Sequence, residues 1–228
     1  SARGARGDGR ILTAKLGSAT QGGMKLYFSP GACSLSPHIA LREAGLDFEL
    51  ERVDFASKKT KHGDDFNAIN PNGYVPALQL DDGEVLTEGP AIVQYIADRV
   101  PERKLAPPPG SFARVRLQEA LNFVSTELHK GFSPLFSKEC PDEWKAVVKT
   151  KLAQRFAVVD RRLGLHPFYT GDDFTVVDGY LFTVTNWAAY VHLDLSPWSN
   201  LLAFRARVGE RPAVLAALEA EGLRKPAH

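Results

Sequence analysis

The sequence of 228 residues has few of the features that mark secreted, membrane-bound or nucleic-acid-binding proteins. Only two cysteines are present, Cys33 and Cys140, which is too few for a disulfide framework and is typical of a reducing compartment. The 28 lysine and arginine residues are balanced by 27 aspartate and glutamate residues, which leaves no excess of positive charge for a nucleic acid or an anionic membrane. No apolar run approaches the roughly 20 residues of a membrane-spanning helix. We therefore expect a cytoplasmic globular protein without nucleic-acid or membrane partners.

The sequence also lacks the patterns of metal, nucleotide and serine-nucleophile sites. It contains no phosphate-binding glycine loop, no dinucleotide fingerprint and no Ser-His-Asp arrangement. No metal-ligand spacing connects His38, His62, His166 and His192. We therefore expect neither a bound metal ion nor a permanently bound cofactor.

Residues 1–23 differ in composition from the rest of the chain. They contain four basic residues and a single acidic one, are rich in glycine and alanine, and offer almost nothing to bury. Met24, the single methionine, follows them directly and precedes an apolar, β-prone run. We expect residues 1–23 to be a loosely ordered extension without a function of its own, with an organellar transit peptide as the alternative.

Residues 24–103 alternate short β-prone runs with helical patterns. These patterns predict strands over 25–29, 48–53, 77–80 and 85–87, and helices over 34–44, 64–69 and around 92–96. Gly45 marks the end of the first helix, and the Asp-Asp-Gly run at 81–83 is typical of a hairpin turn. The resulting order, βαβαββα, predicts a thioredoxin-like α/β domain with one mixed sheet flanked by helices.

The proline-dense segment 101–110 cannot continue a helix and predicts a semi-rigid linker between two domains. Beyond it, every periodic segment is helical. Apolar residues recur at i, i+4, i+7 and i+11 in the first of these segments, at Leu117, Leu121, Val124 and Leu128. We expect an all-α domain over 111–228, with further helices over 148–163, 176–191, 198–208 and 212–221.

Cys33 ends the loop that joins the first predicted strand to the first predicted helix. The free N–H groups and partial positive charge of a helix N-terminus stabilise a thiolate, so we expect the pKa of Cys33 to be lowered. A small buried structural residue is the alternative. Ser36, three residues later, cannot form a disulfide with Cys33, so redox chemistry here would need an external thiol.

Two further motifs fall at strand ends beside this loop. Pro76 enters a strand after a tight turn and is a candidate for a cis peptide bond, which would leave the backbone groups of Val75 free to pair with an extended ligand. An ordinary trans proline is the alternative. The N–H groups of the helix that begins near Gly89 can hold a carboxylate while Glu88 binds an amine, although Glu88 could also be a simple capping residue. Together these motifs suit a ligand built like an amino acid.

Three runs of sequence, KLYFSPGACSLSPH at 25–38, NPNGYVPAL at 70–78 and LTEG at 86–89, resemble those of bacterial beta-class glutathione S-transferases. The resemblance extends over residues 24 to about 222, including the helical half. It implies a thioredoxin-like glutathione domain, a helical domain that supplies the pocket for the second substrate, and a homodimer. The implied activity is conjugation of glutathione, as a co-substrate, to electrophilic and mostly apolar small molecules.

The resemblance also implies roles for individual residues. Cys33 and His129 are the implied catalytic residues at the glutathione sulfur. Independently of the resemblance, we expect Trp187 to pack in the core or to line the substrate pocket. Many transferase classes have serine at the position of Gly89, so only backbone donation is available here. The implied glutathione-binding set is Ala32, Cys33, Tyr74, Val75, Pro76, Glu88, Gly89, Asn122 and Lys130.

The expected homodimer gives Asn122 its role, because this residue is expected to reach glutathione across the dimer. Residues 24–103 carry 8 basic and 13 acidic side chains, whereas residues 104–228 carry 16 and 13. Each acidic half could therefore face its partner's basic half in a two-fold arrangement. Electrostatics would set the orientation of the pair more than its affinity.

Two alternatives to the conjugating enzyme remain open on the sequence alone. In the first, Cys33 itself becomes covalently linked to glutathione, as in a thiol–disulfide oxidoreductase or a reductive dehalogenase. In the second, the chain is a non-catalytic transferase-like protein that binds a ligand or a partner.

Overall fold

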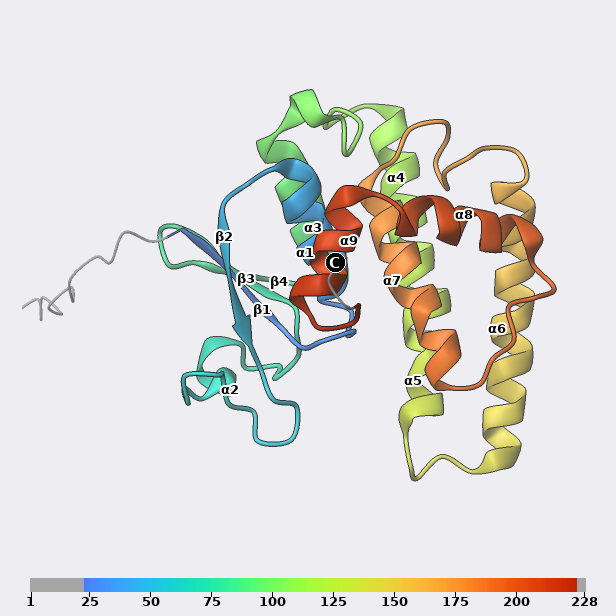
Figure 1. Cartoon of the computed structure of the whole chain (residues 1–228), viewed down its shortest axis with the longest axis horizontal. Helices are drawn as coiled ribbons and strands as arrows, with labels where there is room; N and C mark the ends of the chain where they lie inside the picture. The colour runs from blue at the N-terminus through green and yellow to red at the C-terminus, as the bar shows by residue number, and fades with distance from the viewer. Residues whose placement is uncertain (1–22, 225–228) are drawn as a thin grey trace, which may run out of the picture.

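The computed structural model describes residues 23–224 and has a mixed sheet on one side and a helical half on the other (Figure 1). Apart from Gly23, the extension expected at the N-terminus lies outside the described residues. In Figure 1, helices α1 and α9 lie between the sheet and the longer helices of the C-terminal half. The order of elements confirms the predicted βαβαββα domain followed by helices.

The sheet has the strand order β2-β1-β3-β4. Leu26 of β1 lies opposite Leu50 of the parallel strand β2 and opposite Leu78 of the antiparallel strand β3, so an apolar row crosses the sheet. The elements of this half are β1 (Met24–Phe28), α1 (Leu35–Ala44), β2 (Phe48–Arg52), α2 (Phe66–Ile69), β3 (Ala77–Gln79), β4 (Val85–Thr87) and α3 (Gly89–Arg99).

The C-terminal half is helical along its described length. Its helices are α4 (Phe112–Phe123), α5 (Lys130–Phe136), α6 (Asp142–Leu163), α7 (Val176–Tyr190), α8 (Ser199–Gly209) and α9 (Pro212–Ala220). Between α4 and α5 the chain stays helical but widens into π-type turns over Val124–His129. Such widened turns are frequent at functional sites, because they rotate the following side chains to a new face.

One hydrophobic core runs through both halves of the molecule. It includes Leu26 and Ile39 from the sheet half and Phe132, Phe156 and Val177 from the helical half. Helices α1 and α7 approach closely because α7 carries a glycine at their contact. A Cβ atom at Gly179 would lie 3.3 Å from the Ile39 side chain. The two halves are therefore packed as one body rather than joined only by a linker.

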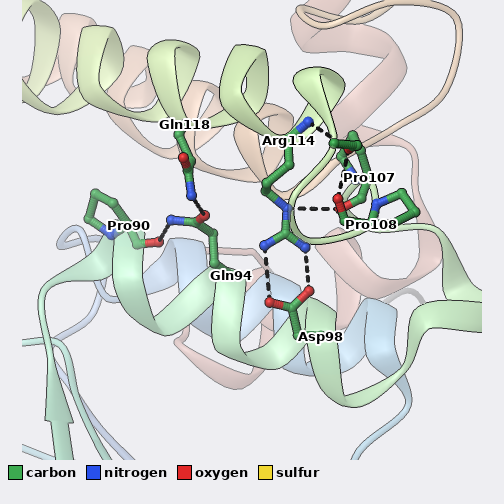
Figure 2. A network of polar contacts seen from close by, with 8 residues as sticks. Pro90, Gln94, Asp98, Pro107, Pro108, Arg114 and Gln118 are labelled. Carbon is green, nitrogen blue, oxygen red and sulfur yellow. Dashed lines mark hydrogen bonds and ion pairs between the residues drawn. The ribbon is translucent and has the colours of Figure 1, made fainter.

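An ion pair between the buried Arg114 and the exposed Asp98 also joins the halves, from α3 to α4 (Figure 2). The Arg114 guanidinium binds both carboxylate oxygens of Asp98, and its Nε donates to the Pro107 carbonyl at 2.8 Å. One turn further along α4, the Gln118 amide donates to Gln94 on α3 at 3.1 Å. Because Arg114 is only 5% exposed, these partners satisfy a charge that would otherwise be costly to bury.

Helix α7 begins with a capping box formed by Thr175 and Asp178. The buried Asp178 carboxylate accepts hydrogen bonds from the backbone N–H groups of Thr175 and Tyr169, each at 2.8 Å. It thereby fixes both the helix start and the loop that precedes it. In the part of the chain that the structure describes, no helix is both long and apolar enough to cross a membrane.

Asp178→Ala should lower the free energy of unfolding by about 2–4 kcal/mol, because two buried N–H groups lose their acceptor. Urea denaturation would measure this loss. Asp173→Ala is the matched control, since Asp173 is exposed in the preceding loop and its loss should change the stability by about 0.5 kcal/mol or less. An Asp178→Ala loss no larger than that of the control would contradict the account.

Candidate functional site

A cavity of about 700 Å³ lies between the two halves, and it is lined by loops and strand ends of the sheet half and by helical residues between 125 and 190. Most of the residues singled out from the sequence line it. They are Ala32, Cys33, Tyr74, Val75, Pro76, Glu88, Gly89, His129, Lys130 and Trp187. Asn122 does not line it; this residue is exposed on α4.

The loop that carries Cys33 is closed by its own hydrogen bonds. The Ser29 backbone N–H donates to the Ser34 hydroxyl oxygen, and that hydroxyl lies 3.2 Å from the Ser29 carbonyl. Gly31 has a φ of 72°, a left-handed conformation that glycine adopts without steric cost. The half-buried Cys33 side chain then faces the cavity at the start of α1.

The lowered pKa expected for Cys33 is wrong. Burial raises the pKa of the Cys33 thiol to about 12, and the backbone N–H groups of Cys33 and Ser34 and the charge of Lys130 offset this effect only in part. The thiol also donates a hydrogen bond to the Val75 carbonyl, with Sγ and oxygen 3.2 Å apart. Cys33 is thus a neutral hydrogen-bond donor at neutral pH. The helix N-terminus stabilises the thiolate by less than burial destabilises it.

The Val75–Pro76 peptide bond is cis, so of the two alternatives weighed from the sequence the cis form is present. Asn70 holds the loop before it, because its side-chain amide donates to the Tyr74 carbonyl at 2.7 Å. Asn70 is only 3% exposed. The sequence did not reveal this structural role, because Asn70 belongs to a turn motif that by itself explains an asparagine at this position.

Glu88 has a φ of 66°, which is uncommon for a residue with a Cβ atom. Such a conformation costs of order 1–3 kcal/mol and is concentrated at functional sites. The Glu88 carbonyl accepts from the first N–H groups of α3, at Ala91 and Ile92, while its side chain borders the cavity. Pro90 lies in the first turn of α3. The strained residue therefore places a carboxylate beside a helix N-terminus.

On the opposite wall, the π-type turns carry Ser125 and His129 to the cavity. Burial, assisted by the charge of Lys130, lowers the pKa of His129 to about 4, so its imidazole is neutral at physiological pH. The ring packs edge-on against Trp187, with centroids 4.9 Å apart and planes at 73°. His129 Nδ1 lies 2.6 Å from the Tyr180 hydroxyl oxygen.

Trp187 has both roles that the sequence left open. Its ring borders the cavity while the side chain is 7% exposed and part of the core. Its indole N–H donates to the Gly31 carbonyl at 2.8 Å, so it also anchors the loop that carries Cys33. Tyr180 was missed, although it lies seven residues before Trp187 and therefore on the same face of α7.

A buried carboxylate from the C-terminal end of the chain also reaches this loop. Glu221 accepts from the Gly31 backbone N–H at 2.9 Å and lies 2.8 Å from His38 Nδ1. Arg42 donates to the other ring nitrogen of His38 at 2.9 Å. No periodic or motif signal marked Glu221, because its partners lie some 180 residues earlier in the chain.

The chemistry of the cavity is that of a thiol-binding site with few charges. Within residues 23–224, no cluster of three or more histidine, cysteine, aspartate or glutamate residues could hold a metal ion. The groups available to bind a ligand in the cavity are neutral donors at Cys33 and His129, the Lys130 ammonium, the Glu88 carboxylate and the backbone of Val75. A thioredoxin-like domain with these groups, closed by a helical domain, defines the class of two-domain thiol transferases.

Comparisons with known proteins narrow this class to one family. Residues 31–99 match the family model for the glutathione S-transferase N-terminal domain, and residues 123–212 match that for the C-terminal domain. Over 201 residues the chain is 50% identical to the glutathione S-transferase GstA of Escherichia coli O157:H7, a match that covers 88% of this chain and 100% of the relative. The chain belongs to the glutathione S-transferase family.

Two solved structures agree with this assignment. A sphingomonad glutathione S-transferase complexed with glutathione has 50% identity and a TM-score of 0.85, covering 88% of this chain and 100% of that one. The beta-class enzyme of Sphingomonas chungbukensis has 48% identity and a TM-score of 0.85, with the same coverage. The resemblance to bacterial beta-class transferases is confirmed.

Proposed function

We propose that this protein conjugates glutathione, as a co-substrate, to electrophilic and mostly apolar small molecules. The observation that carries the proposal is the placement of Cys33, Val75 and Glu88 on one wall of a single cavity, with His129 and Trp187 on the other. The relative with bound glutathione, half identical in sequence, supports the same ligand here.

Glutathione fits the sheet-side wall as an extended peptide. Glu88 would bind the α-amino group of the γ-glutamyl end, and the Gly89 backbone N–H at the start of α3 would bind its carboxylate, because the Ala91 and Ile92 N–H groups already donate to the Glu88 carbonyl. The Val75 backbone would pair with the cysteinyl residue, as in the addition of a strand to a sheet edge. Because the Val75 carbonyl accepts from the Cys33 thiol in the free protein, an incoming peptide N–H would take over this acceptor and release the thiol toward the glutathione sulfur.

The reaction needs a glutathione thiolate next to an electrophile. The thiol proton passes to water, the sulfur forms a bond to the electrophilic carbon, and the leaving group departs with its electron pair. Cys33 and His129 would stabilise the sulfur as neutral donors, with Lys130 supplying positive charge at the mouth of the cavity. Fixing both reactants in one cavity adds the advantage of proximity.

The second substrate would bind against aromatic side chains. Trp187, Phe136 and Tyr190 border the cavity beyond the sulfur position. Phe136 and Trp187 meet edge to face, with ring centroids 5.9 Å apart. A wall of this kind favours flat, apolar electrophiles.

The redox alternative and the non-catalytic alternative receive less support. A nucleophilic Cys33 would need a thiolate, and burial favours the thiol instead. The family and its named members are transferases, which favours turnover over binding alone.

Retention on immobilised glutathione and conjugation of chlorodinitrobenzene test the proposed function together. Glu88→Gln should raise the KM for glutathione about tenfold or more, because a charge-assisted contact to the amine is lost. Glu84→Gln, at an exposed position on the neighbouring hairpin, is the control and should leave KM unchanged. Retention without turnover on any electrophile would instead identify a binding protein.

We further propose that the protein is a homodimer that acts in the cytoplasm. Phe112 and Val115 lie one turn apart on α4 and are 71% and 51% exposed, so they offer an apolar surface that a second copy could cover. Asn122 lies on the same helix and outside its own chain's cavity, so any contact with glutathione would be across the dimer. Both cysteines are free, which suits a reducing compartment.

Light scattering at micromolar concentration should give a mass about twice that of the 25.0 kDa chain. A stable and fully active monomer would remove both the dimer and the role of Asn122.

For the location, fractionation of the source cells should recover the protein with the cytosol; recovery from an organelle or from outside the cell would contradict it.

A further inference from the structure

The strongest polar contact of His129 is with a residue that has no role in the mechanism so far. Tyr180 on α7 is 2% exposed, and its hydroxyl oxygen lies 2.6 Å from His129 Nδ1. The two rings are perpendicular, with planes at 88° and centroids 5.9 Å apart, which brings the phenol oxygen to the imidazole edge. Both side chains border the cavity that also contains Cys33.

The surroundings of Tyr180 determine which group donates. Burial raises the pKa of Tyr180, so the phenol keeps its proton. Because the Tyr180 hydroxyl is buried, its proton needs a hydrogen-bond acceptor. His129 Nδ1, 2.6 Å from the hydroxyl oxygen, is that acceptor.

A neutral imidazole has one donor and one acceptor nitrogen. If Nδ1 accepts from Tyr180, the ring proton must be on Nε2. Within residues 23–224, the buried side-chain nitrogen and oxygen atoms that lack a hydrogen-bond partner belong to Ser36 and Arg205, not to His129. No group in the same residues bonds to Nε2, so this nitrogen opens on the cavity.

We propose that Tyr180 is a positioning residue that holds His129 in the Nε2–H tautomer, so that His129 donates a hydrogen bond to the glutathione sulfur and does not accept its proton. The inference rests on the proposed function and deepens it, because it decides between two exclusive roles for His129. As a donor, the imidazole stabilises a thiolate whose proton has gone to water. To act as a base, the imidazole would need an unprotonated Nε2. The hydrogen bond from Tyr180 to Nδ1 keeps the ring proton on Nε2 and so prevents this.

Trp187 prevents the His129 imidazole from rotating out of this orientation. Its ring packs against His129, and its N–H is tied to the Gly31 carbonyl, so the tryptophan cannot move aside without disturbing the Cys33 loop. A rotation of the imidazole that exchanged Nδ1 for Nε2 would break both the Tyr180 hydrogen bond and this edge-on contact. The tautomer and the ring orientation are therefore fixed together.

Nitrogen-15 NMR of the histidine side chains tests the proposal without reference to activity. The free protein should show His129 as the Nε2–H tautomer, and Tyr180→Phe should convert it to a mixture of tautomers while the ring packing is kept. Tyr190→Phe is the matched control, because Tyr190 borders the same cavity but its hydroxyl makes no hydrogen bond with any described residue. The control should leave the tautomer unchanged.

An Nδ1–H tautomer in the free protein, or an unchanged tautomer in Tyr180→Phe, would overturn the proposal. Kinetics then connects the tautomer to turnover: Tyr180→Phe should lower kcat about tenfold while the KM for glutathione changes less than twofold. An unchanged kcat in Tyr180→Phe would also overturn it. The failure of the proposed function is distinguishable, since it would appear as no conjugation by the unmodified protein whatever the tautomer.

Discussion

The geometry of the cavity depends on the way in which the helical half holds the two peptide groups of Gly31. The Gly31 N–H donates to Glu221 at 2.9 Å, and its carbonyl accepts from the Trp187 indole at 2.8 Å. The φ of 72° at Gly31 makes both contacts compatible with a sharp turn from β1 into α1. Cys33 follows two residues later, so these two contacts, from α7 and from the residue after α9, set where its sulfur lies. The same tryptophan orients His129, and thus one side chain aligns both walls of the cavity.

In the proposed reaction, the site would stabilise a thiolate with neutral donors more than with a fixed positive charge. Burial keeps Cys33 protonated and His129 deprotonated, and both effects follow from desolvation of the charged form. In a cavity of low polarity, such preorganised donors are worth more than they are in water, and they need no reorganisation when negative charge develops on sulfur. In this proposal, burial that disfavours a Cys33 thiolate keeps Cys33 and His129 as neutral donors for a ligand thiolate between them.

The sequence predicted the order of elements because each element carries its own local signal. Gly45 ends α1 in a left-handed conformation, Pro90 lies in the first turn of α3, and Thr175 with Asp178 starts α7. Most of the site residues that local motifs and the family resemblance indicated do line the cavity. Asn70 and Glu221 escaped prediction because their roles come from partners that the fold brings together, and periodicity carries no information about such partners. The expected acidity of Cys33 was wrong because position at a helix start is visible in a sequence, whereas the extent of burial is not.

In the proposed reaction, the bound glutathione, and not Cys33, provides the reactive thiolate. Ultraviolet absorbance of the thiolate during a pH titration tests it directly, in protein that carries Cys33→Ala and Cys140→Ser so that glutathione is the thiol observed. The account predicts that the pKa of bound glutathione lies about one unit or more below that of free glutathione, and that the variant still conjugates electrophiles. An unshifted pKa, or loss of conjugation together with Cys33, would contradict it.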